Sequence, residues 1–309
     1  MIPCVTIIIL NWNGLADTLE CLESLADLDY PAYEVVVVDN GSMDGSVEAI
    51  RGCFPQVTLI ENSENMGFAE GNNVGTRRAL EHGADYVLLL NNDTVVDSAF
   101  LVELVNVAET DGEIGVASPL IFYYDAPDEI WTAGATINWV NGSTRRLRAG
   151  ETAHEGEPTF DVDFVSGCAL LAKREVIETT GFLDPDYYLY YEEADWCVRA
   201  RNQGYRIVCV PQAKMWHKVS RSIGSSSPLV SYYMTRNALL FLRKHLSGIQ
   251  QVLSLGRSLV STARSVVSIY TKRKNAHRRA NARAQVLGVW DFARGRFGAA
   301  RMPDQRVST

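Results

Sequence analysis

The chain lacks features that mark secreted, disulfide-bonded or zinc-structured proteins. No basic region precedes an apolar stretch at the N-terminus, so we expect no signal peptide. None of the six cysteines forms a CxxC pair, and four of them lie in apolar runs; they are Cys4, Cys21, Cys53, Cys168, Cys197 and Cys209. We therefore expect buried free thiols in a reducing compartment, with neither a disulfide framework nor a zinc site.

Length and composition are those of an ordinary globular protein. The 309 residues are 47% hydrophobic and 21% charged, enough for one large α/β domain or two small ones. The net charge of −8 is unevenly distributed. From Arg243 onward there are 14 Lys and Arg residues and two acids, Asp291 and Asp304, a net charge of +12 that leaves −20 for the preceding part. This asymmetry indicates an acidic body with a basic, surface-seeking tail.

Apolar runs alternate with helical patterns in the first half of the chain. The predicted strands are Val5–Leu10, Glu34–Val38, Val57–Ile60, Tyr86–Leu90 and Gly115–Ser118, and the predicted helices are Leu15–Leu25, Gly45–Arg51, Ala69–His82 and Ala99–Glu109. Apolarity in the strands is continuous, as in parallel strands buried on both faces. This pattern predicts an α/β fold with a mostly parallel sheet flanked by helices, and ligands at the carboxyl ends of the strands.

The second half of the chain is less regular. After a loop-rich, aromatic stretch at 119–160, the predicted elements are a buried strand at Phe164–Ala172, a helix at Tyr191–Gln203 and a strand at Tyr205–Val210 that Pro211 ends. We divide the chain into a domain at 1–245, with a nucleotide-binding half at 1–118 and an acceptor half at 119–245, and a tail at 246–309.

The predicted tail begins with an amphipathic helical pattern at residues 249–270. Apolar side chains share one stripe, while Arg257, Arg264 and serines occupy the other face. The two arginines argue against a membrane-spanning helix. We expect 249–285 to lie in the membrane interface, and the alternative is that the apolar stripe packs on the catalytic domain or on a second copy in a homodimer.

Polar side chains follow three of the predicted strands. Asn11, Asp39 and the run Asn91-Asn92-Asp93 come directly after the first, second and fourth strands, so they should converge at one edge of the sheet. A carboxylate at Asp39 can accept hydrogen bonds from a ribose or a base, and one at Asp93 can hold Mg²⁺ together with substrate phosphates. From position alone Asp39 is equally a turn or helix-capping residue, and for Asp93 a turn or N-cap is the favoured interpretation.

A glycine-rich segment, Asn65–Asn73, links the third strand to the next helix. Its glycines permit close approach of the backbone to a ligand, and the helix N-terminus favours an anion. The segment fits neither the GxGxxG nor the Walker A pattern, so an ordinary connection is the alternative.

Three acids lie at the start of the predicted helix that follows a run of tyrosines. Glu192, Glu193 and Asp195 are stabilised there by the helix dipole, and Asp195 can pair with Arg199 four residues on. A carboxylate among aromatic side chains also suits a general base. Because Glu192 and Glu193 are ~100° apart around the helix, we expect them not to face one cleft together. His217 is predicted in a loop, where a lone histidine is usually not a ligand.

Taken in order, these segments resemble glycosyltransferase family 2. The resemblance lies in Val36–Ser46, Asn65–Asn73, Leu90–Asp93, Gly167-Cys168, Gly181–Asp184 and Glu192–Arg199, and covers roughly residues 4–245. More narrowly, the chain is similar to the rhamnosyltransferase-like branch of bacterial envelope polysaccharide synthesis. The resemblance implies a GT-A fold and inverting transfer of a sugar from a nucleotide diphosphate to an acceptor hydroxyl.

The resemblance also assigns roles to residues. It implies donor contacts for Asn11, Asp39, Asn65, Gly67, Asn72 and Asn92, a Mg²⁺ or Mn²⁺ site at Asp93 and His217, a catalytic base at Glu193 supported by Asp195, and acceptor contacts for Trp196 and Tyr191. The metal motif of the family is often Asp-x-Asp, and Asn91 stands at its first position, which removes one negative charge.

The resemblance implies a cytoplasmic enzyme, peripheral on the inner face of the cell membrane, with no nucleic-acid partner. dTDP-rhamnose is the commonest donor in this branch, while relatives use UDP-hexoses or UDP-galactofuranose; the acceptor is a glycan or a polyprenyl-linked saccharide. A sugar nucleotidyltransferase is a rival, but the place for its basic loop holds Asn11–Gly14 without Lys or Arg. A non-catalytic sugar-binding protein, the second alternative, would not need Asp93 and Glu193 together.

Overall fold

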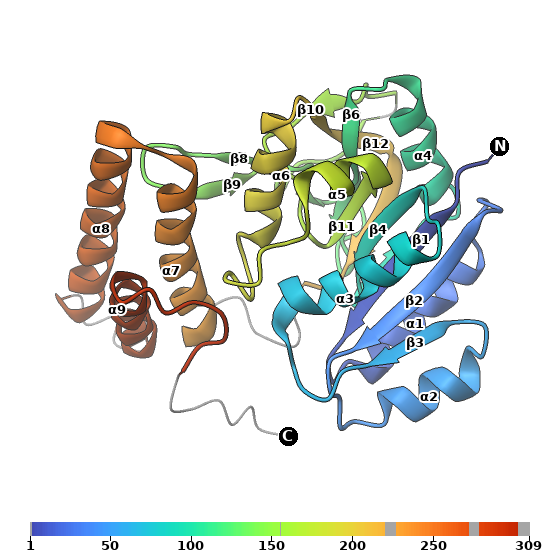
Figure 1. Ribbon diagram of the computed structural model, residues 1–309, viewed down its shortest axis with the longest axis horizontal. Coiled ribbons are helices and arrows are strands. Elements are labelled where there is room, and N and C mark those ends of the chain that lie inside the picture. The colour runs from blue at the N-terminus through green and yellow to red at the C-terminus, as the bar shows by residue number, and fades with distance from the viewer. Residues whose placement is uncertain (1, 155, 220–226, 272–277, 302–309) are drawn as a thin grey trace. The chain divides into compact units, whose positions relative to one another are not determined.

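The computed structural model describes residues 2–154, 156–219, 227–271 and 278–301 (Figure 1). Residues 272–277 and 302–309 of the predicted tail lie outside the described residues. The strands are β1 (Val5–Asn11), β2 (Tyr33–Asp39), β3 (Thr58–Glu61), β4 (Tyr86–Asn91), β5 (Thr94–Val96), β6 (Ile114–Tyr123), β7 (Ile130–Thr132), β8 (Ala135–Ile137), β9 (Thr144–Arg146), β10 (Phe160–Asp161), β11 (Ala169–Lys173) and β12 (Arg206–His217). The helices are α1 (Leu15–Ala26), α2 (Ser46–Cys53), α3 (Gly67–Glu81), α4 (Phe100–Thr110), α5 (Arg174–Thr180), α6 (Glu192–Asn202), α7 (Pro228–His245), α8 (Gly248–Thr271) and α9 (Arg279–Ala293).

The described residues fall into two compact units. The first consists of Met1–Ile137, Thr144–Asp184 and Glu192–Ser222, and the second of Asn138–Ser143, Pro185–Tyr191 and Ile223–Thr309. The second unit thus takes in α7 and two short segments from earlier in the chain, whereas the sequence suggested a boundary after residue 245. No helix in the described part of the chain has the length and apolarity needed to cross a bilayer.

The first unit is built on a mostly parallel sheet, as predicted. Within the described residues its strand order is β10-β12-β6-β11-β4-β1-β2-β3, with β5 added beside β12 and β7 beside β6. Strands β3, β2, β1 and β4 run parallel, and β11 runs antiparallel to both of its neighbours. Strand β1 therefore lies between β2 and β4. The chain adds β2 and β3 on one side of β1 and β4 on the other, so the strand order reverses at β1. The carboxyl end of β1 is thus a topological switch point.

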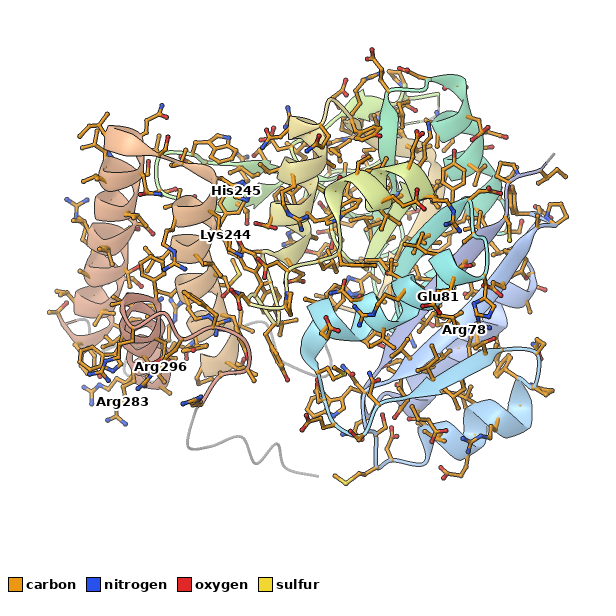
Figure 2. The ribbon with its side chains drawn as sticks, viewed as in Figure 1. Arg78, Glu81, Lys244, His245, Arg283 and Arg296 are labelled. Atoms are coloured by element: carbon orange, nitrogen blue, oxygen red, sulfur yellow. The ribbon has the colours of Figure 1, made fainter. Side chains whose placement is uncertain are left out.

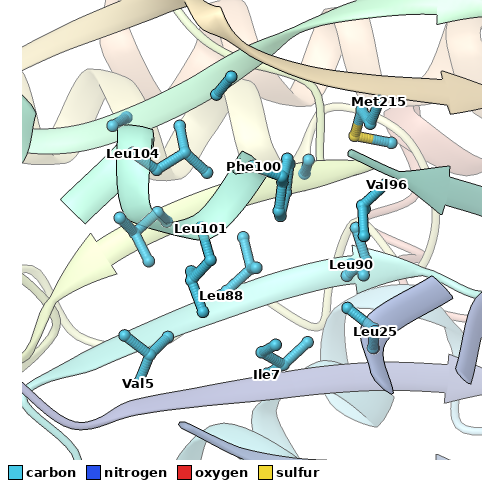
Figure 3. Packing of buried hydrophobic residues seen from close by; sticks show 14 of the residues in the cluster. Val5, Ile7, Leu25, Leu88, Leu90, Val96, Phe100, Leu101, Leu104 and Met215 are labelled. Atoms are coloured by element: carbon cyan, nitrogen blue, oxygen red, sulfur yellow. The ribbon is translucent and has the colours of Figure 1, made fainter. Parts of the chain in front are cut away.

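Both faces of the central strands are buried, which explains their continuous apolarity. On one face, Ile7 of β1 and Leu88 of β4 belong to a core with Phe100 and Leu104 of α4 (Figure 3). On the other, α3 lies so close that a Cβ on Gly75 would stand 2.6 Å from the Cγ2 of Ile8. Glycine at this position therefore lets the helix approach the sheet.

Three predicted strands differ from the observed ones. The strand expected to end at Pro211 continues to His217, because a register shift between Val210 and Lys214 takes the proline out of the regular ladder. The strand expected at Gly115–Ser118 extends to Tyr123. The strand expected at Phe164–Ala172 is shorter and begins only at Ala169.

All six cysteines are free thiols, as expected from their spacing. Four of them are buried, namely Cys21, Cys168, Cys197 and Cys209, whereas Cys53 is exposed. Burial raises the pKa of the Cys21 and Cys197 thiols to about 12, which keeps them protonated and unreactive.

Candidate functional site

The polar residues at the strand ends converge as predicted. The register pairs Asn11 with Asp39 across β1 and β2, and Leu10 with Asn91 across β1 and β4. The side chains of Asn11 and Asp39 are buried, and Asn11 Nδ2 donates a hydrogen bond of 2.7 Å to Asp39 Oδ1. Because both residues end parallel strands, the sheet itself fixes this contact.

Asn11 organises the edge of the sheet. Its Oδ1 accepts hydrogen bonds from the Thr18 hydroxyl at 2.8 Å and from Asn92 Nδ2 at 3.3 Å. Asp39 in turn accepts from the backbone N–H of Ser42 at 2.8 Å, so it also has the turn role that the sequence left open. Each side-chain oxygen of Asp39 has one hydrogen-bond donor among the described residues, and a carboxylate oxygen has room for a further donor.

The glycine-rich segment is attached to the same edge through Asn40. Asn40 Nδ2 donates to Asn65 Oδ1 at 3.2 Å and to the Gly67 carbonyl at 3.1 Å. Gly67 has φ of +82° and starts α3, two residues earlier than predicted. Asn72 is buried and donates to the Phe68 carbonyl within the helix.

Asp93 and His217 come together from different parts of the chain. His217 Nε2 is 3.1 Å from Asp93 Oδ1, because β12 runs antiparallel to β5 and pairs His217 with Thr94. His217 is 4% exposed, and neither of its ring nitrogens has a hydrogen-bond partner among the described residues. The close approach therefore lacks hydrogen-bond geometry. The expected loop position of His217 is wrong, because it is the last residue of a strand.

This pair fits a divalent cation. A buried imidazole nitrogen without a hydrogen bond is rare unless it serves a ligand, and it lies beside a carboxylate. The described residues contain no group of three or more His, Cys, Asp or Glu side chains suited to a metal. Two protein ligands leave the other positions of Mg²⁺ or Mn²⁺ to phosphate and water oxygens, which is common for these ions.

The three acids of α6 differ in accessibility. Glu192 and Asp195 are 3% and 1% exposed, whereas Glu193 is only partly buried. Asp195 Oδ2 accepts a hydrogen bond of 2.8 Å from Arg199 Nε, which confirms the expected pair. A Cβ on Gly167 would lie 2.9 Å from the Phe68 ring and 3.8 Å from Glu193 Cβ, so Glu193 is close to the glycine-rich segment.

Glu192 and Glu193 do interact, against expectation. Burial and the negative charge of Glu193 raise the pKa of the Glu192 carboxyl well above its ordinary value, and the two side chains are hydrogen-bonded. The helix separates their Cβ directions, but both side chains bend into the same surroundings. Of the two carboxyls, Glu192 is thus the one that burial favours in its protonated form, and the negative charge of the pair lies on Glu193.

The sequence model of one family, described as "Glycosyl transferase family 2", matches residues 6–181. The chain belongs to glycosyl transferase family 2. Its matched region contains Asn11, Asp39, Asp93 and the glycine-rich segment. The chain is therefore a glycosyltransferase that takes a sugar from a nucleotide sugar, and the rival classes of nucleotidyltransferase and non-catalytic binding protein are not favoured.

Named relatives include rhamnosyltransferases. The chain is 24% identical to the dTDP-rhamnosyl transferase RfbF of Shigella flexneri, over 95% of this chain and 97% of that protein. It is 25% identical to the N-acetylglucosaminyl-diphospho-decaprenol L-rhamnosyltransferase of Mycobacterium tuberculosis, over 74% of this chain and 80% of that protein. Among known proteins, this family 2 chain is thus similar to rhamnosyltransferases.

Solved structures show the same GT-A fold. The mannosyltransferase PcManGT of Pyrobaculum calidifontis, in complex with GDP-Man and Mn²⁺, has a TM-score of 0.61 at 17% identity and covers 95% of this chain and 88% of its own. TarS 1-349 of S. aureus, in complex with UDP-GlcNAc, has a TM-score of 0.58 at 17% identity and covers 94% of this chain and 80% of its own. At these identities the likeness establishes the fold, which agrees with the fold predicted from the motifs.

Two residues that the resemblance assigned to the acceptor lie in the interior. Trp196 is 3% exposed, and its indole N–H donates to the Gly181 carbonyl at 2.6 Å. Tyr191, in the second unit, is 4% exposed, and its hydroxyl donates to the Gly142 carbonyl at 2.7 Å. Both side chains therefore have structural partners, and we do not propose acceptor contacts for them.

Several residues of the family 2 site did not stand out in the sequence. Asn40 lies within the motif Val36–Ser46 without a distinguishing signal of its own, although it joins the end of the second strand to the glycine-rich segment. Thr18 lies on α1, and no sequence pattern marks it, because it accepts its hydrogen bond from Asn92 across a long separation in the chain. Trp131 packs edge-on against His217 with ring centres 4.6 Å apart.

Proposed function

We propose that this glycosyltransferase uses Mg²⁺ or Mn²⁺ to transfer a sugar, with rhamnose as the first candidate, from a nucleotide diphosphate to a lipid-linked saccharide. The observation that carries the proposal is the approach of the buried His217 to Asp93, at the same sheet edge as Asn11 and Asp39. The named rhamnosyltransferase relatives support the sugar and the lipid-linked acceptor. Such an acceptor is available at the cytoplasmic face of the cell membrane, where we place the reaction.

The donor is held along the carboxyl ends of β1, β2 and β4. Asp39 accepts hydrogen bonds from the nucleoside, and the Asn11 network fixes its orientation. Asn65, Gly67, Asn72 and Asn92 lie on the same side, with Gly67 at the N-terminus of α3, where anionic groups are favoured. Asp93 and His217 would hold the cation, which supplies positive charge beside the departing diphosphate.

Glu193 acts as the general base. The acceptor oxygen forms a bond to the anomeric carbon while its proton passes to the Glu193 carboxylate. The bond between the anomeric carbon and the phosphate oxygen breaks, and its electron pair leaves with the diphosphate. Attack opposite the leaving group inverts the anomeric configuration. Asp195, paired with Arg199, supports the start of α6.

A donor screen tests this proposal. Titration calorimetry with dTDP-rhamnose, UDP-glucose and UDP-GlcNAc, each with Mn²⁺ and with excess chelator, should show one preferred donor whose binding depends on the cation. Transfer of labelled sugar to a polyprenyl-diphospho-GlcNAc acceptor then identifies the product. Full turnover in chelator would remove the metal from the proposal, and transfer only to a soluble glycan would replace the lipid-linked acceptor.

A further inference from the structure

Helix α8 presents its apolar side outward. The side that faces the rest of the second unit is rich in serine: Ser254 and Ser258 are buried, and Ser254 Oγ donates to the Trp139 carbonyl at 2.9 Å. The predicted apolar stripe is exposed instead, with exposed fractions of 71% for Ile249, 63% for Val252, 48% for Leu253, 51% for Val260 and 58% for Val267. Within the second unit, the apolar stripe is therefore not the face through which α8 packs.

Arginines border this outward apolar face of α8. Arg257 and Arg264 were expected on the face opposite the apolar stripe, but they lie at its border: each follows an exposed apolar residue, Leu253 or Val260, by about one helical turn. Both arginines are exposed. A helix with an apolar face bordered by arginines is typical of segments that lie in a membrane interface.

Helix α9 also exposes apolar side chains next to arginines. Val286 and Trp290 are 55% and 50% exposed, and the guanidinium of Arg294 lies 3.8 Å from the centre of the Trp290 ring. Figure 2 shows Arg283 with its side chain directed away from α9. Tryptophan and arginine together suit the headgroup region, where an apolar ring and a charged group are both accommodated.

The charge of these helices selects a bilayer over a second copy of the chain. In the described residues from Arg243 onward the only acid is Asp291, which is buried and accepts a hydrogen bond from the Tyr232 hydroxyl. Two copies joined through α8 would bring Arg257 and Arg264 near other arginines without acids to neutralise them. Anionic headgroups supply that neutralisation.

We propose that the exposed faces of α8 and α9 bind an anionic lipid bilayer, with the apolar side chains of α8 inserted and the arginines at the lipid phosphates. The partner is a lipid surface rather than a donor or acceptor sugar. Binding is measured without nucleotide or metal, so its failure would leave the proposed transfer reaction untouched.

Sedimentation of the full-length chain with vesicles tests the proposal. Phosphatidylcholine vesicles with phosphatidylglycerol should pellet the protein, and phosphatidylcholine alone should pellet much less. R257E/R264E should lower the partition coefficient by at least about 30-fold, since each basic residue near an anionic surface contributes roughly a factor of five. R145E/K214E changes the net charge equally at exposed positions of the first unit and should bind normally.

A second pair of variants examines the apolar face. V260Q/V267Q should lower the partition coefficient of the protein into vesicles by about tenfold or more, because two apolar side chains that would transfer from water into the bilayer are replaced by polar ones. I2Q/V140Q, at sites 59% and 52% exposed, is the matched control, and V260L/V267L should bind at least as well as the native chain. Equal pelleting of V260Q/V267Q and the native chain would overturn the proposal. The proposal would also be overturned if light scattering without lipid showed a dimer of the native chain and a monomer of V260Q/V267Q.

Discussion

His217 Nε2 lies 3.1 Å from Asp93 Oδ1, at a point where the last residue of β12 meets the turn before β5. Neither ring nitrogen of His217 has a hydrogen-bond partner in the described part of the chain, although the side chain is only 5% exposed. A buried imidazole beside a carboxylate has the ligand atoms that a divalent cation needs. The pair therefore links the fold to the chemistry proposed for this enzyme.

The first prediction concerns this pair. Asp93→Ala should abolish Mn²⁺-dependent binding of the nucleotide diphosphate, because the charged ligand is lost. His217→Ala should weaken it by about 10- to 100-fold, since phosphate oxygens still hold the ion. Calorimetry with and without Mn²⁺ measures both effects. His82→Ala, at an exposed histidine, is the control, and an unchanged affinity in Asp93→Ala would remove the metal site from this position.

The second prediction concerns the base. Glu193→Gln keeps the size of the side chain but cannot take the acceptor proton, so turnover should fall by about 10²–10⁴-fold with donor affinity nearly unchanged. Glu48→Gln removes the same charge from the first turn of α2 and should be fully active. If Glu193→Gln turns over normally while a folded Asp195→Asn is inactive, the base is Asp195.

The third prediction is a pH dependence of stability. The pKa of Glu192 is raised in the folded chain by burial and by the charge of Glu193, so the folded state keeps a proton that the unfolded state loses. Above the ordinary glutamate pKa of about 4.3, folding stability therefore falls as pH rises towards the raised value. Glu192→Gln does not titrate, so its melting temperature should gain on that of the native chain as the pH rises above the ordinary glutamate pKa. A constant difference as the pH rises would contradict the raised pKa.

The fourth prediction concerns the tyrosine segment before α6. Three tyrosines have positive φ angles: 65° for Tyr188, 67° for Tyr190 and 76° for Tyr191. Residues other than glycine adopt such angles only when the surrounding structure holds them there. Asn237 is fully buried, and its Nδ2 donates to the carbonyls of Tyr187, Leu189 and Tyr190. Asn237→Ala removes the donor that these three carbonyls share, although the Tyr187 carbonyl keeps its hydrogen bond from Arg236 Nη2, and should destabilise the fold by about 2 kcal/mol.

Urea denaturation measures this loss. Gln250→Ala, at an exposed position of α8 in the same unit, should change stability by less than about 0.5 kcal/mol. An equal effect of the two substitutions would mean that the segment holds its conformation without Asn237.

Local patterns were enough for the half of the site that lies on parallel strands. Asn11 and Asp39 each end a continuous apolar run, and strands of that kind pair in a predictable direction, so their contact at 2.7 Å follows from sequence order alone. The Asp195–Arg199 pair was equally predictable, because one helical turn separates the two residues. The family motifs then indicated which chemistry these residues perform.

The other half depends on contacts that no local pattern encodes. Pro211 predicted the end of a strand, yet a register shift lets β12 continue and bring His217 to Asp93. The amphipathic pattern of α8 fixed the two faces of the helix but not which one points outward. That was decided by packing: the buried Ser254 donates a hydrogen bond to the backbone carbonyl of Trp139, and the apolar face is exposed. Sequence therefore determined most of the secondary structure, the sheet and the reaction class through short-range periodicity and motif order. The approach of His217 to Asp93 and the outward apolar face were decided by tertiary packing, since both depend on partners distant in the chain.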